Sequence, residues 1–306
     1  MMLKWINLNG TFLLKKSWNL TSVVYSALGF LAVWCSLEGL LPNNISIWRK
    51  ISFSILIFII IYILFFICTS IWYYYHNSIC VIKKGNGKKV YVKYGDFIEE
   101  IKCSKERKNF IIPVNRCFDT IVDDRIISNN SIHGAFLKYL YSINLFSPEG
   151  LYSEIERELK DTECIELSPK NKPEGNRLRY PTGTIVDISD YSSNNHYYLL
   201  GLTTFDKNLT AHSSKEDFLL AIQRLIEYCN NHSQGYPVVL PLIGSGLART
   251  NISKNDALRY LVRALEINKD IINCDFYIIV WNKEITFPRA LTIGRRFCKF
   301  AKTLQL

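Results

Sequence analysis

Uncharged apolar residues form two long runs near the start of this 306-residue chain. The run over 51–75 has no charged side chain and is rich in Ile and Phe. A helix rises about 1.5 Å per residue, so roughly 20 apolar residues cross a hydrocarbon core of about 30 Å. Because a continuous helix also satisfies its own backbone hydrogen bonds in lipid, this pattern predicts a transmembrane helix over 51–75.

The run over Leu20–Leu37 is also uncharged but contains more small and hydroxyl side chains. One interpretation is a signal peptide, with Lys15 and Lys16 ahead of its apolar stretch. However, no clear small-x-small cleavage site follows, and the stronger run begins soon afterwards. We therefore expect a transmembrane anchor of two helices within 1–79, followed by a soluble domain over 80–306.

Basic residues flank these two runs unevenly. Lysines precede the first run and follow the second, whereas the short connection carries Arg49 and Lys50. Cytoplasmic flanks of membrane spans are enriched in Lys and Arg. The distribution therefore predicts a multi-pass membrane protein with both termini, and hence the soluble domain, in the cytoplasm.

From residue 79 onward, short apolar runs alternate with amphipathic segments. Two β-rich runs around Gly85-Asn86-Gly87 predict a hairpin. Strands are also expected over 109–114, 183–188, 197–203, 237–243 and 276–281, and helices over 131–142, 148–160, 214–230 and 253–268. Near-continuous apolar strands that alternate with helices indicate a mixed or parallel sheet with helices on both faces. Ligands of such sheets bind at the carboxyl ends of the strands.

The formal net charge of +10 raises the question of an acidic partner. Lysines that face anionic lipid explain part of this excess, and the chain has no nucleic-acid motif, so nucleic acid is not an expected partner. The nine cysteines are scattered and form no CxxC pair, as in a reducing compartment, and the five histidines lack metal-ligand spacing. We expect neither a structural metal nor a cofactor.

The segment Leu240–Arg249 carries the strongest candidate chemistry. A buried strand is expected to end near Ile243, and Gly244-Ser245-Gly246 follows it. Glycine permits positive φ and close backbone approach, so consecutive N–H groups can point at an anion. A helix begins a few residues later, and a helix amino end favours phosphate. A simple tight turn is the alternative, so the interpretation depends on other segments.

Four other segments accompany this loop in a defined order. Gly95-Asp96 precedes an expected strand, Asn115 ends the next strand, Ser131–Ala135 (SIHGA) opens a helix, and Trp281 follows the last strand. With the loop at 244–248, this order resembles the macro domain, a family that binds ADP-ribose. The resemblance begins near residue 85 and continues to the end of the chain.

The resemblance implies a role for each segment in binding an ADP-ribose derivative. Asp96 would accept from the adenine amino group, Trp281 would pack on adenine, and Asn115 would lie near the distal ribose. Two loops would surround the diphosphate and distal ribose: one has Ser131, His133 and Gly134, and the other Gly244, Ser245, Gly246, Leu247 and Arg249. Each of these residues also has a purely structural interpretation, as a turn, cap, core or solvated residue.

Two departures from the macro family change the functional expectation. The triple-glycine run of many ADP-ribose hydrolases is replaced by NNSIHGA, and Asn115 is followed by Arg-Cys-Phe-Asp rather than Ala-Ala-Asn. Both departures put hydrolase activity in doubt. They also suggest a ligand with a different distal end, for which Asp119 is a candidate partner if that end is cationic.

The predicted fold is therefore two N-terminal transmembrane α-helices followed by an α/β macro domain. This combination resembles the membrane-anchored macro-domain effectors of type II Thoeris antiphage defence. In that family a TIR-domain partner converts NAD into a histidine–ADP-ribose conjugate, which binds the macro domain. The resemblance implies an oligomeric, ligand-gated effector of the bacterial inner membrane rather than an enzyme. A membrane-tethered ADP-ribosyl hydrolase that uses His133 or Asp119, and a passive scaffold, are the alternatives.

Overall fold

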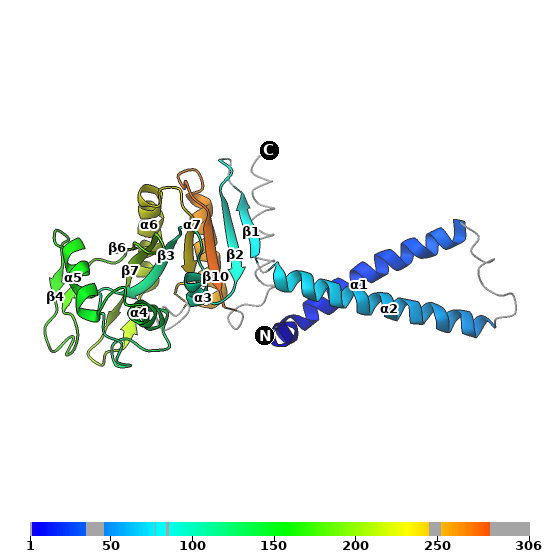
Figure 1. Ribbon diagram of the computed structural model, residues 1–306, viewed down its shortest axis with the longest axis horizontal. Coiled ribbons are helices and arrows are strands. Elements are labelled where there is room, and N and C mark those ends of the chain that lie inside the picture. The colour runs from blue at the N-terminus through cyan, green and yellow to red at the C-terminus, as the bar shows by residue number, and fades with distance from the viewer. Residues whose placement is uncertain (1, 35–45, 77, 84–85, 245–251, 282–306) are drawn as a thin grey trace. The chain divides into compact units, whose positions relative to one another are not determined.

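The computed structural model describes residues 2–34, 46–76, 78–83, 86–244 and 252–281. These residues divide into two compact units, one within 1–77 and the other within 78–285. The first unit is a pair of helices and the second is an α/β domain (Figure 1). The predicted site residues Ser245, Gly246, Leu247 and Arg249 lie outside the described residues.

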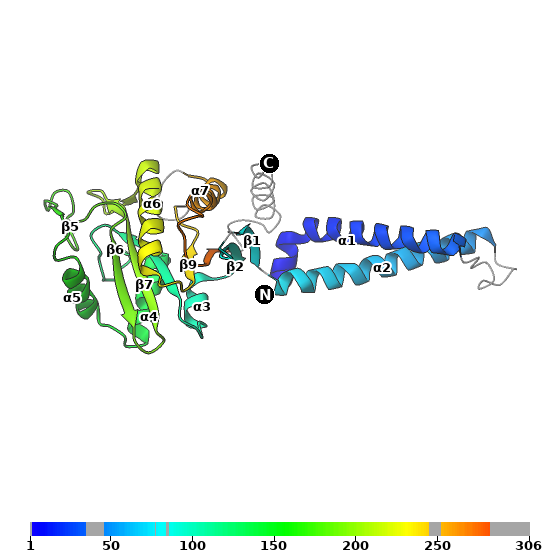
Figure 2. The same ribbon diagram turned by 90° about the horizontal axis from the view of Figure 1, so that it is seen from above.

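In the first unit, α1 (Met2–Trp34) and α2 (Ile47–Tyr75) run antiparallel and side by side (Figures 1 and 2). Over Trp48–Tyr75, α2 is long and apolar enough to cross a membrane, and no other helix of the described residues passes the same test. The predicted pair of transmembrane helices is therefore not confirmed. The helix α1 begins well before Leu20 and includes three lysines, so it is apolar over only part of its length.

A mixed sheet forms the centre of the second unit, in the order β1-β2-β10-β9-β3-β7-β6. The strands β2, β10, β9, β3 and β7 are mutually parallel, whereas the outer strands β1 and β6 pair antiparallel with β2 and β7. Their bounds are β1 (Ser78–Lys83), β2 (Lys89–Tyr94), β3 (Asn109–Asn115), β6 (Ile185–Asp190), β7 (Asn195–Phe205), β9 (Val238–Pro241) and β10 (Phe276–Val280). The prediction of a mixed sheet, including the hairpin of β1 and β2, is confirmed.

Three short strands add to this framework. The strand β8 (Ala211–His212) pairs antiparallel with the end of β7. The strands β4 (Ile165–Glu166) and β5 (Leu178–Arg179) form a separate two-stranded ribbon. Two-residue strands leave no alternating pattern in the sequence, which is why they were not predicted.

Helices cover both faces of the sheet, as predicted (Figure 2). The helices α6 (Lys215–His232) and α7 (Lys254–Ile267) lie on one face, and α3 (Phe97–Lys102), α4 (Ile132–Ser142) and α5 (Pro148–Glu158) lie on the other. Each of the four longer helices begins after a serine whose hydroxyl accepts from a backbone N–H of the first turn: Ser131, Ser147, Ser214 and Ser253. Such N-caps fix where a helix starts, and so they position the loops that precede it.

The predicted element after Gly95-Asp96 is wrong. The Gly95-Asp96 segment precedes the helix α3, not a strand. The Asp96 carboxylate caps this helix, because its Oδ1 accepts from the N–H groups of Ile98 at 2.8 Å and Glu99 at 3.2 Å. The helix has only six residues and buries two of them, which is too few to produce a helical period in the sequence.

Candidate ligand-binding site

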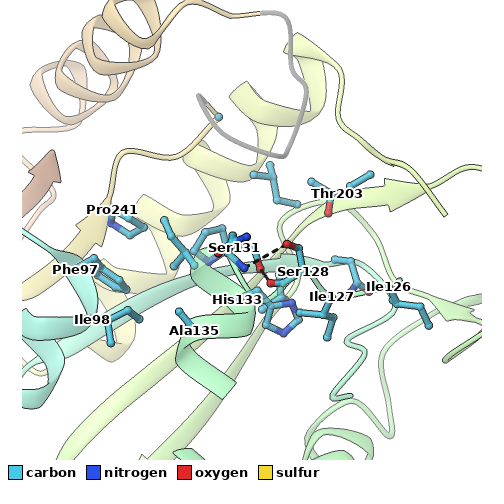
Figure 3. A pocket seen from close by; sticks show the side chains of 18 of the residues that line it. Phe97, Ile98, Ile126, Ile127, Ser128, Ser131, His133, Ala135, Thr203 and Pro241 are labelled. Carbon is cyan, nitrogen blue, oxygen red and sulfur yellow. Dashed lines mark hydrogen bonds between the residues drawn. The ribbon is translucent and has the colours of Figure 1, made fainter. Parts of the chain in front are cut away.

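The parallel strands end at one edge of the sheet, and a cavity of about 530 Å³ lies there. Each of the five strands contributes a lining residue at or after its end: Asp96, Asn115, Phe205, Leu242 and Trp281. Figure 3 shows Phe97 and Pro241 on one side of this cavity and Thr203 and Ile126 on the other, with Ser131 between them. The volume suits a small-molecule ligand, and the location is the one that the predicted topology indicates.

Asn115 ends β3 and places a polar group at the floor of the cavity. Its side-chain Oδ1 accepts from the Cys117 N–H at 3.0 Å, which fixes the orientation of the amide. The Nδ2 atom is buried and has no hydrogen-bond partner among the described residues. An unpaired buried donor costs about 1–3 kcal/mol, and a ligand oxygen in the cavity would remove that cost.

The amino end of α4 borders the same cavity. The Ser131 hydroxyl accepts from the Gly134 N–H at 2.9 Å and lies 2.7 Å from the Ser128 carbonyl oxygen, to which it donates (Figure 3). The N–H groups of Ile132 and His133, in the first turn, have no acceptor within the helix. These donors and the dipole of the eleven-residue helix favour an anion in the cavity.

Two glycines shape the walls without contributing a side chain. At Gly134 a Cβ would lie 2.2 Å from the Ser128 carbonyl oxygen, so this glycine allows α4 to pack closely on the preceding loop rather than lining the cavity. Gly244 does line the cavity and has φ +87°, where a Cβ would lie 2.8 Å from the Phe218 ring. Gly244, the first residue of the predicted second phosphate loop, therefore has a backbone conformation that favours glycine.

The two residues assigned to adenine lie at neighbouring strand ends. The Gly95 N–H donates to the Val280 carbonyl at 3.2 Å, which joins the segment that contains Asp96 to the segment that contains Trp281. Both side chains line the cavity, and that of Trp281 is half exposed. One oxygen of Asp96, Oδ1, already caps α3. The geometry brings the predicted pair together, and its role in binding adenine stays a prediction.

His133 lies in the wall of the cavity but brings no positive charge to it. The side chain is buried, and burial lowers the pKa of the imidazole to about 3. The ring is therefore neutral at physiological pH. A neutral ring has one nitrogen that donates a hydrogen bond and one that accepts. It cannot neutralise the charge of a diphosphate.

His133 should make the stability of the protein depend on pH. An unfolded histidine titrates near 6.5, so between pH 6.5 and about 3 the unfolded state takes up a proton that the folded state does not. Acidification then favours unfolding, and the free energy of unfolding should fall by about 2 kcal/mol between pH 6.5 and 5. Chemical denaturation of the wild type and of His133→Gln at several pH values would show a shallower pH dependence in the variant. Equal slopes would mean that the ring is not held neutral.

Asp119 is not placed where a ligand could reach it, which corrects the expectation that it binds a cationic distal group. Its carboxylate is buried, with Oδ2 2.7 Å from Nζ of the fully buried Lys172 and Oδ1 accepting from the Asn176 N–H at 2.6 Å. It does not line the cavity. A buried ammonium requires a paired counter-charge, and Asp119 supplies it.

Two wall segments were not predicted, one over 124–130 and one over 202–211. The first segment folds around Asp123, whose Oδ1 accepts from the N–H groups of Arg125 at 2.9 Å and Ile126 at 2.8 Å. The second is the turn between β7 and β8, where Oδ1 of Asp206 accepts from the N–H groups of Asn208 and Thr210. Aspartate ahead of polar residues is a signal for such turns, and it could have located both loops but not their side chains.

Comparison with known proteins is consistent with this geometry. The family model described as "Thoeris protein ThsA, Macro domain" matches residues 90–280. The Thoeris protein ThsA of Bacillus amyloliquefaciens (strain Y2) is 26% identical over 191 residues, which are 60% of this chain and 59% of that protein. The chain thus spans about three fifths of the length of this curated relative.

Solved structures of an Oceanobacillus iheyensis macrodomain are also similar. The structure with MES bound has a TM-score of 0.45 and 10% sequence identity, and it covers 74% of this chain and 97% of that one. A mutant of the same macrodomain with ADPR has a TM-score of 0.45 and 11% identity, and it covers 74% and 99%. Because the ThsA family model extends over more than half of the residues, this chain belongs to the ThsA macro-domain family of Thoeris proteins.

Proposed function

We propose that this protein is a membrane-associated antiphage effector, activated when an ADP-ribose derivative binds the cavity at the sheet edge. The observation that carries the proposal is the buried Nδ2 of Asn115, which has no hydrogen-bond partner among the described residues, in a cavity that the amino end of α4 also lines. The Asn115 amide can donate to a sugar hydroxyl, and the amino end of α4 favours an anion. Together they suit a ligand in which a ribose is joined to a diphosphate. Membership of the Thoeris family supports an NAD-derived signal from a TIR-domain partner, and a histidine–ADP-ribose conjugate is the ligand we expect.

The protein is proposed to hold this ligand without cleaving it. Hydrolysis requires a base with a pKa near the working pH, in reach of an attacking water. Burial lowers the pKa of His133 to about 3, so its imidazole is a weak base. The Asp119 carboxylate is paired with Lys172 and lies outside the cavity wall. Both observations support the proposal that neither residue acts as the base of a hydrolase.

The membrane part of the proposal rests on α2 and its packing with α1. An isolated apolar helix of this length supports insertion into a bilayer, and α1 supplies a second helix with an uncharged half. We propose that both helices span the inner membrane, with the α/β domain in the cytoplasm. A pair of helices encloses no pathway, so action on the membrane requires several copies. Small residues of α1, such as Ala27 and Gly29, allow close helix approach.

Asp96→Ala should weaken binding of the adenosine end about ten- to a hundredfold. The substitution removes one charge-assisted hydrogen bond, worth roughly 1.5–3 kcal/mol. It also removes the cap of α3, so a matched control is needed. Ser147→Ala removes a comparable cap from α5, away from the cavity. Calorimetry should find weaker binding by Asp96→Ala and normal binding by Ser147→Ala. Normal affinity of Asp96→Ala would mean that Asp96 does not contact the adenine base.

The membrane action is tested in liposomes that carry the full chain and a trapped dye. We expect the histidine–ADP-ribose conjugate to shift cross-linked protein to larger oligomers and to release the dye. Gly29→Leu, which adds bulk to the proposed assembly face, should block release and leave ligand binding intact. If saturating conjugate changes neither the oligomers nor the dye, the helices are only an anchor.

A further inference from the structure

Hydroxyl side chains are concentrated in the contact between α1 and α2. Oγ of Ser17 lies 2.9 Å from Oγ1 of Thr69, and the Tyr25 hydroxyl is hydrogen-bonded to Ser54. Ser17 and Thr21 are 0% exposed, and Ser70 is 1% exposed. We call this set the hydroxyl seam: Ser17, Thr21, Tyr25, Ser54, Thr69 and Ser70.

The hydroxyl seam extends along both helices rather than lying at one crossing point. Its α1 members, Ser17, Thr21 and Tyr25, are spaced four residues apart, so they lie on one face of that helix. On α2 the members Ser54 and Thr69 are fifteen residues apart, which corresponds to about 22 Å of helix. On α1 the members span eight residues, or about 12 Å, so the seam covers more of a hydrocarbon core of roughly 30 Å on α2 than on α1.

The rest of the helix pair has the surface of a simple anchor. Ile55, Ile59, Ile63 and Ile67 of α2 are each about half exposed and apolar. Apolar side chains at the contact would hold such an anchor equally well, because hydrogen bonds between membrane helices add only modestly to their association. Moreover, Oγ1 of Thr21 is buried without a partner among the described residues. Polar groups inside a membrane typically face a partner or a water-filled cavity.

We propose that the hydroxyl seam is the lining of the pathway by which the activated protein makes the membrane permeable to small solutes. This inference rests on the proposed function, that is, on membrane action gated by ligand binding. In the resting pair Ser17 bonds to Thr69 and Tyr25 bonds to Ser54. The hydroxyls of Ser17, Thr69 and Ser70 also donate to backbone carbonyls of their own helices. In the assembled state α1 and α2 separate along the seam, and the same hydroxyls turn to water. The seam has no charged side chain, so the pathway passes anions and cations alike.

A reversible cross-link across the seam tests this inference. Ser17→Cys and Thr69→Cys are combined in a full chain in which Cys35 and Cys68 are replaced by Ala, since the two native oxygens are close enough for a disulfide. After oxidation, dye release induced by the histidine–ADP-ribose conjugate should fall at least tenfold, with unchanged binding of the conjugate. Reduction of the disulfide should restore release. In a variant that carries only one of the two substitutions, oxidation should leave the rate of release unchanged.

The outcomes separate the inference from the function on which it rests. Full release from the oxidised, cross-linked protein would refute the seam as a pathway and leave the ligand-gated membrane action standing. Absence of release from the wild type would refute the membrane action itself and the inference with it. In the wild type, an anionic and a cationic dye of similar size should be released at rates within about threefold of each other. Exclusion of either dye would contradict a lining of neutral hydroxyls.

Discussion

Gly244→Asp is expected to abolish binding of an ADP-ribose derivative, with a loss of affinity of more than about a hundredfold, or roughly 2.7 kcal/mol. Gly244 lines the cavity at φ +87°, at the start of the loop proposed to hold the diphosphate. The new carboxylate would repel the diphosphate, and its Cβ would press on the Phe218 ring. Calorimetry on the folded variant measures the loss.

The matched control is Gly235→Asp. Gly235 also has a positive φ, of +77°, but an added Cβ there meets nothing within 4 Å, and the residue does not line the cavity. The control therefore carries the same charge and a similar backbone cost without reaching the ligand. Binding should be retained in the control. Equal losses in the two variants would assign the effect to general backbone strain, and normal binding by Gly244→Asp would place the diphosphate elsewhere.

Lys172→Met should lower the free energy of unfolding by about 3–5 kcal/mol. Lys172 is fully buried, and its ammonium lies 2.7 Å from Asp119 Oδ2 and also donates to the Asn176 carbonyl. Removal of this cation leaves the Asp119 carboxylate buried and unpaired. The segment after Asn115, which fixes the cavity floor, would then lose its anchor. Denaturant unfolding followed by circular dichroism measures the change.

Two further variants make this prediction specific. Lys172→Met combined with Asp119→Leu removes both charges and should recover most of the lost stability, because no charge is left unpaired. Lys102→Met breaks the exposed pair with Glu99 and should cost no more than about 1 kcal/mol. A loss for Lys172→Met as small as that for Lys102→Met would mean that the buried pair is not intact in solution.

The pattern of apolar residues was sufficient to predict the longer strands and helices. The strand β3 is a continuous apolar run because helices cover both sides of it, and α6 begins after Ser214, as its N-cap signal predicts. The helix α3 was missed because its six residues are positioned mainly by the Asp96 cap and by burial of Phe97 and Ile101. The mixed topology then placed the cavity at the carboxyl ends of the strands without any further information.

Individual side chains of the site were harder to predict. The sequence predicts that Asn115 lies at the end of its strand. It does not predict that Oδ1 accepts from the Cys117 N–H, which orients the amide and leaves Nδ2 without a partner among the described residues. Asp119 was assigned to a cationic end of the ligand, but its partner is Lys172, which lies 53 residues further along the chain. No local pattern reveals that pair. Local turn signals at Asp123 and Asp206 could locate both wall loops, but only the folded chain shows that these loops reach the cavity.

Calorimetric titration of the full chain in detergent with the histidine–ADP-ribose conjugate tests the central claim most directly, provided that the ligand is recovered and analysed afterwards. We expect saturable binding of one conjugate per chain and recovery of the conjugate intact. Asn115→Ala, which removes the unpaired donor, should weaken that binding about tenfold. Absence of binding by both the conjugate and ADP-ribose, or their steady cleavage by the wild type, would contradict the account.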